Sequence, residues 1–147
     1  MELLALILLG TLTGNELAVS AFVHPAISKL PDSAHSASAR GIARVYGKYA
    51  PFWYAATLVS LVVLAWRLRA EEPRRLLFGA SAAIMAVALI FTLVGPVPVN
   101  NRVSTWDLDN LPSNWKSDRS RWDMLHAIRT MMLLASFICL ASGATRK

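Results

Sequence analysis

The sequence is poor in charged residues and contains a single cysteine. Charged side chains make up 16% of the 147 residues, whereas apolar residues make up 55%. A soluble domain of this size needs a continuous polar coat, but here the polar residues fall in patches between long uncharged runs. That distribution is typical of helices that face lipid. The lone Cys139 excludes an intrachain disulfide and a cysteine-based metal cluster.

The net charge of +6 does not form a basic stripe, so we expect no nucleic-acid partner. The basic residues instead collect beside apolar runs, where the phosphates of a lipid bilayer would lie. Those nearest to the apolar runs are Arg67, Arg69, Arg74, Arg75, Arg146 and Lys147.

Four apolar runs have about the 20 residues needed to cross the hydrocarbon core of a membrane. They predict an all-α fold, a four-helix antiparallel bundle forming one transmembrane domain over residues 1–147, with a long polar loop at 99–121. The predicted spans are about 3–27, 51–68, 76–94 and 122–143. Glu2 stands where a cleaved signal would carry Lys or Arg, so we expect the first run to be retained.

The connectors give a topology. Residues 28–50 are interpreted as a polar connector that holds a short interfacial helix over 40–49, with Pro51 opening the second span. An even number of spans places both termini on one side of the membrane, together with a tight turn at 70–73. The dense basic residues on that side favour cytosolic termini. A homo-oligomer is compatible with the sequence.

Ionisable residues inside the predicted spans are costly in lipid unless they are paired, so they mark candidate functional sites. Glu16 and His24 lie in the first span, and His126 and Arg129 lie in the fourth. Antiparallel packing brings the two histidines to a similar depth and predicts an ion pair between Arg129 and Glu16. This pair either fixes the register of the helices or forms part of a pocket. The expected pocket roof is formed by Trp106, Trp115, Asn100 and Asn101.

Two histidines beside a carboxylate also suggest a metal site. Glu16 and His24 are about 12 Å apart along a straight helix, too far to bind one ion. The alternative site therefore combines His24 and His126 with Asp107, Asp109 or Asp123, and would hold copper or iron.

A sequence pattern near the fourth span carries a family resemblance. The pattern reads P-V-N-x-R…W…R-x-x-W…H-x-x-R and comprises Pro98–Arg102, Trp106, Trp115, Arg119, Trp122, His126 and Arg129. With three apolar spans before it, the chain resembles the anthrone oxygenase-like family of small four-helix membrane proteins. The likeness in span layout covers nearly the whole chain, and it is specific between Pro96 and Arg129.

The resemblance implies that O₂ oxidises a phenolic tricyclic anthrone to a quinone, without a flavin, haem or metal. His126 would be the general base. Arg129, with Asn100 or Asn101, would stabilise the developing enolate oxygen. The remaining expected substrate contacts are Trp106, Trp115 and Trp122, stacked on the flat rings, and Glu16, His24 and Arg119.

Two other interpretations stay open at this point. Glu16 and His24 stand where a family member is expected to have neutral residues, which leaves room for a metal-dependent membrane oxidase. The third interpretation is a non-enzymatic membrane subunit, or a binder of apolar ligands, in which the polar cluster only specifies packing.

Overall fold

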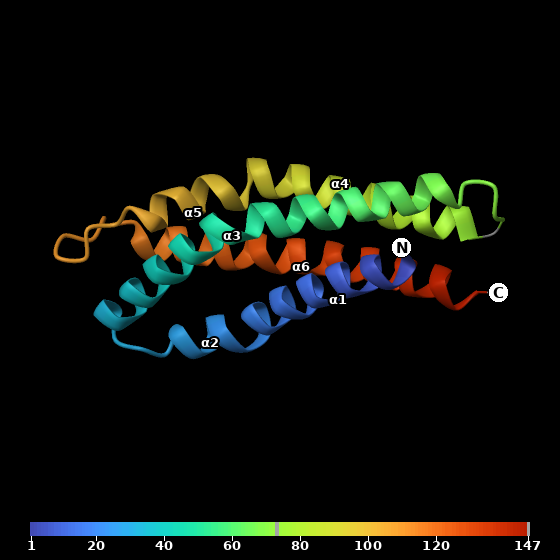
Figure 1. The fold of residues 1–147 in the computed structure, drawn as a ribbon. Helices are drawn as coiled ribbons and strands as arrows, with labels where there is room; N and C mark the ends of the chain where they lie inside the picture. The colour runs from blue at the N-terminus through green and yellow to red at the C-terminus, as the bar shows by residue number, and fades with distance from the viewer. Residues whose placement is uncertain (73, 147) are drawn as a thin grey trace.

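A computed structural model describes residues 1–72 and 74–146. The predictions made for Pro73, in the turn, and for Lys147, at the lipid headgroups, fall outside the described residues. The described chain is helical throughout its regular structure (Figure 1). The elements are α1 (Glu2–Ala18), η1 (Val19–Val23), α2 (His24–Ile27), α3 (Asp32–Arg67), α4 (Arg74–Val94), α5 (Pro96–Ser104) and α6 (Trp115–Thr145). The first three form one continuous helix.

Four of these helices are long and apolar enough to cross a membrane, which confirms the predicted fold class. They are Glu2–Ile27, Asp32–Arg67, Arg74–Val94 and Trp115–Thr145. Each packs on two others, in the cyclic order α1, α3, α4 and α6. Both termini lie at one end of the bundle with the α3–α4 turn, and the α2–α3 turn and the α5–α6 loop lie at the other (Figure 1).

The centre of the bundle is apolar. Leu9, Leu61, Met85 and Leu133 are at most 1% exposed, and they come from the four different long helices. Large apolar side chains also cover the outside of the bundle, among them Ile7, Val59, Ile90 and Met131. Aliphatic side chains on the outside of a helical bundle fit contact with lipid, because lipid tails are as apolar as they are.

The segment predicted as a connector at 28–50 is mostly helical, which corrects the expected short helix at 40–49. Helix α3 begins at Asp32 and continues through Pro51 for 36 residues. Its first half is held by α5: the Arg44 Nε donates to the Ser104 carbonyl at 2.9 Å, and the Asn100 Nδ2 donates to the Ala43 carbonyl at 3.0 Å.

Helix α5 shortens the predicted polar loop at 99–121. Helix α4 ends at Val94, as the predicted span of 76–94 requires, and a second helix follows at once. A proline fits the first turn of a helix, where its missing N–H has no partner to lose. Here Pro96 opens α5 directly after Gly95. The irregular connection is therefore limited to residues 105–114, and α6 begins at Trp115 rather than near Trp122.

Candidate functional site

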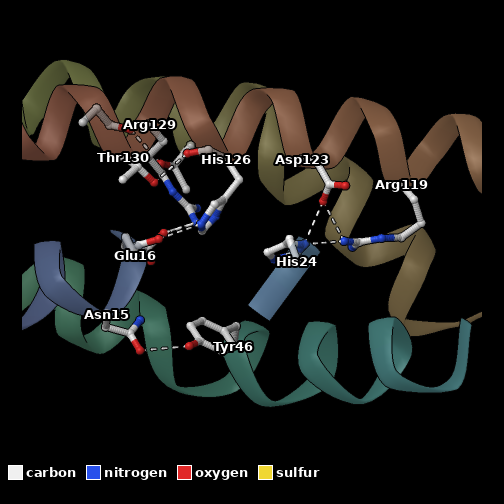
Figure 2. A network of polar contacts seen from close by, with 11 residues as sticks. Asn15, Glu16, His24, Tyr46, Arg119, Asp123, His126, Arg129 and Thr130 are labelled. Atoms are coloured by element: carbon white, nitrogen blue, oxygen red, sulfur yellow. Dashed lines mark hydrogen bonds and ion pairs between the residues drawn. The ribbon is translucent and has the colours of Figure 1, made fainter. Parts of the chain in front are cut away.

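Glu16 of α1 and two residues of α6 form a buried polar cluster. The Arg129 Nη2 lies 2.5 Å from the Glu16 Oε2, which confirms the predicted ion pair. The same Nη2 lies 2.8 Å from the His126 Nδ1. Glu16 and His126 are each 1% exposed, and Arg129 is 7% exposed. Figure 2 shows all three side chains converging between the two helices.

The hydrogen bonds around His126 define its tautomer. Its Nε2 lies 3.1 Å from the Glu16 backbone carbonyl, which can only accept, so Nε2 carries the proton. Nδ1 then presents its lone pair to the guanidinium of Arg129. With this tautomer the ring is a neutral imidazole, and its basic nitrogen is covered by Arg129 and lies 3.3 Å from the Glu16 Oε2.

A second polar cluster lies nearer the loop end of the bundle. The His24 Nδ1 lies 2.8 Å from the Asp123 Oδ1 and 2.6 Å from the Arg119 Nη2. Arg119 also donates to Asp123 at 2.7 Å. His24 and Arg119 are buried, whereas the Asp123 side chain is 39% exposed. In Figure 2 this cluster stands beside the first one, along the same face of α6.

Trp122 joins the two clusters. Its ring stacks on His24 and on His126, with a centroid separation of 4.6 Å in each case. The two imidazole centroids are 5.4 Å apart, so the expectation that both histidines share one depth is confirmed.

The π-helical turn η1 explains how Glu16 and His24 reach the same face. In an uninterrupted α-helix, a separation of eight residues overshoots two full turns by roughly 80°. A π-turn takes up one extra residue, which removes most of that offset. Residues Val19–Val23 form such a turn, directly between Glu16 and His24. Single π-turns inside α-helices occur frequently at functional sites.

A cavity of about 350 Å³ lies beside the first cluster, between α3, α4, α5 and α6. Its walls are mostly apolar, and Arg129 is the charged residue among them. Trp122 also faces this cavity, but His126 is not part of the lining and stands behind Arg129 and Trp122. Direct contact between a ligand and His126 therefore requires Arg129 or Trp122 to move.

The structure divides the residues that the sequence analysis placed in one pocket. Asn100, Asn101, Trp122 and Arg129 line the 350 Å³ cavity. Glu16 lines a smaller cavity of about 200 Å³ between α1 and α3.

Trp106 and Trp115 do not form the expected roof. Their rings pack edge to face, 6.0 Å apart, inside an apolar cluster near the loop end of the bundle that also contains Trp122. Neither tryptophan belongs to the lining of the 350 Å³ cavity, nor do His24 and Arg119. Stacking of Trp106 and Trp115 on a ligand in this cavity is thus not supported by their positions.

The alternative metal site does not fit the donors present. Asp107 is exposed in the loop after α5, where its Oδ1 accepts from the Asp109 N–H. The carboxylate beside His24 is Asp123, and each histidine also faces a guanidinium. Among the described residues, no group of three or more His, Cys, Asp or Glu side chains is arranged to hold a metal ion.

Helix α3 supplies a wall of the cavity that the sequence analysis missed. Tyr46, Gly47, Pro51 and Tyr54 all line it. Tyr54 is 2% exposed, and its hydroxyl has no hydrogen-bond partner in the described structure. Its ring lies 5.5 Å from the Arg129 guanidinium. Pro51 and Tyr54 lie in an apolar run, and nothing in the sequence distinguishes them from residues that face lipid.

The chain matches the anthrone oxygenase family over residues 42–139. This region holds most of α3, all of α4 and α5, and the part of α6 with His126 and Arg129. Four membrane-length helices and a cavity beside the buried Glu16–Arg129 pair are the features of a small helical membrane protein with an internal cavity. The chain belongs to the anthrone oxygenase family, as its resemblance implied. Comparisons with curated proteins and with solved structures give no match.

Proposed function

We propose that the protein is a membrane-embedded oxygenase that oxidises a planar aromatic ketone of the anthrone type with O₂. The observation that carries this proposal is the apolar cavity whose charged wall residue, Arg129, is bonded to both Glu16 and His126. Membership of the anthrone oxygenase family supports an oxygenase-like role.

The cavity suits a small, flat and largely apolar molecule. A volume of about 350 Å³ falls within the usual range of small-molecule sites. Tyr54 and Trp122 supply aromatic surface for ring contacts, and Arg129 supplies a cation for an oxygen that becomes negative during reaction. A bilayer also concentrates apolar molecules around the protein.

The chemistry balances with O₂ as the oxidant. Removal of one proton from the methylene carbon opposite the ketone leaves an electron-rich enolate, which transfers electrons to O₂ and forms a carbon–oxygen bond. The resulting peroxide loses the second methylene proton as its O–O bond breaks, which leaves a second ketone and releases water. One O₂ is consumed for each quinone and each water formed.

His126 is the residue we assign as general base, and Arg129 is the residue that stabilises the enolate oxygen. When Arg129 turns towards the substrate oxygen, the Nδ1 lone pair of His126 is uncovered. That nitrogen can take up the first methylene proton and give it to the peroxide anion. It can then take up the second methylene proton as hydroxide leaves, and pass that proton to the hydroxide to form water. Glu16 balances the positive charge that builds up on the pair. Asn100 and Asn101 offer neutral polar contacts at the loop end of the cavity.

Oxygen uptake by the purified protein in detergent micelles tests the proposal. We expect anthrone-dependent uptake with one quinone formed per O₂, and a fall of about 10²–10⁴-fold in kcat for His126→Ala. His35→Ala is the matched control, because His35 packs against Trp115 away from the cavity and should leave the rate unchanged. Unchanged turnover in a folded His126→Ala variant would rule out the role assigned to His126.

A further inference from the structure

Pro51 interrupts the hydrogen bonding of α3. It lies inside the helix, where every other residue type would donate its N–H to the carbonyl four residues earlier. Proline has no N–H, and its ring pushes that carbonyl away. The carbonyl concerned belongs to Gly47. Prolines bend helices in this way, and α3 changes direction between its first part and the part that runs along the bundle (Figure 1).

The residue that carries this carbonyl lies on the cavity side of α3. Gly47 and Pro51 are one helical turn apart, and both line the 350 Å³ cavity. The Asn100 amide, a polar group beside Gly47, donates instead to the Ala43 carbonyl at 3.0 Å. Within the described residues no side chain donates to the Gly47 carbonyl. A backbone acceptor without a partner is costly in an apolar setting.

The absence of a side chain at position 47 keeps this acceptor accessible. A Cβ built on Gly47 would lie 3.2 Å from the Asn100 Nδ2, closer than an ordinary contact. Any larger residue would therefore push the amide away from Ala43 or project into the cavity. Glycine at position 47 therefore leaves space in the cavity wall beside its own carbonyl.

The Gly47 carbonyl and the Arg129 guanidinium lie at different depths along the bundle. Gly47 and Tyr54 are seven residues apart on α3, which is about 10 Å along the helix. The ring of Tyr54 lies against the Arg129 guanidinium. A flat ligand that spans the cavity can thus place an oxygen on Arg129 and a hydroxyl near Gly47.

We propose that the Gly47 carbonyl, exposed by Pro51, accepts a hydrogen bond from a ring hydroxyl of the substrate. This inference rests on the proposed function for the aromatic ketone core of the ligand, and it assigns the residue that contacts a ring hydroxyl remote from the reacting carbon. Gly47 and Pro51 act as specificity-determining residues and take no part in proton transfer.

The test is anaerobic binding, followed by quenching of tryptophan fluorescence. The two probes are anthraquinone and a monohydroxylated anthraquinone whose hydroxyl is remote from both ketones, at a pH where the hydroxyl is protonated. Pro51→Ala and Pro51→Gly both restore the N–H and return the Gly47 carbonyl to the helix. We expect each variant to lose about threefold to tenfold of the preference for the hydroxylated probe over anthraquinone, measured as the ratio of the two dissociation constants.

Gly41→Ala is the matched control, because it changes the same helix at a position with nothing within 4 Å of the added Cβ, away from the cavity. It should alter the binding of neither probe. An unchanged preference for the hydroxylated probe in both Pro51 variants would overturn the inference and leave the proposed function standing. If the wild-type protein binds neither probe, the proposed function fails and the inference fails with it.

Discussion

Neutralising Glu16 removes one partner of a buried ion pair and should destabilise the bundle strongly. In Glu16→Gln, Arg129 keeps its charge at 7% exposure and faces His126 without a carboxylate. Breaking a buried pair in this way costs about 3–5 kcal/mol. The Glu72→Gln change breaks the Arg75–Glu72 pair, whose side chains are 53% and 52% exposed, and should cost no more than about 1 kcal/mol.

The free energy of unfolding in mixed detergent micelles, followed by tryptophan fluorescence, measures both costs. The charge-reversed double variant Glu16→Arg with Arg129→Glu should recover a large part of the stability that either single reversal loses, because the pair can form again with its charges exchanged. A Glu16→Gln cost no greater than that of Glu72→Gln would refute the reasoning. So would a double variant no more stable than the two single reversals.

Three further predictions concern packing, topology and metal content. Gly143→Ala would place a Cβ 2.7 Å from the Phe78 ring and should cost about 1–3 kcal/mol in unfolding experiments, whereas Gly14→Ala, with nothing within 4 Å, should be neutral or slightly stabilising. Tags at the two termini should be labelled from the same side of the membrane, opposite to residues 105–114; cytosolic termini remain our prediction, and labelling from outside intact cells would contradict it. Elemental analysis should find no stoichiometric copper or iron, and a metal that disappears in His24→Ala would instead support the metal-dependent oxidase.

The long helices and the buried ion pair could be predicted from the sequence. Uncharged runs of membrane length located the four spans, because a water-soluble helix of that length would carry polar residues on its outer face. The Glu16–Arg129 pair followed from depth along two antiparallel helices and from the cost of a lone charge in lipid. Neither argument needs the exact rotation of a helix.

The shape of the cavity could not be predicted from the sequence, because it depends on long-range contacts and on local departures from regular helix geometry. Helix α3 continues through Pro51, where a proline usually indicates a boundary, and its first half is held by bonds to α5 such as that from Arg44 to Ser104. The π-turn that rotates His24 into line with Glu16 has no simple sequence signal. The placement of Trp106 and Trp115 depends on how the loop end folds.

A structure of the protein with a bound anthraquinone would test the central claim most directly, because it locates the ligand relative to the ionised cluster. The account predicts density for the ring system between α3 and α6, in the cavity lined by Tyr54, Trp122 and Arg129, with one ligand oxygen on the guanidinium. Density for the ligand at another site, with this cavity occupied only by lipid, would contradict it.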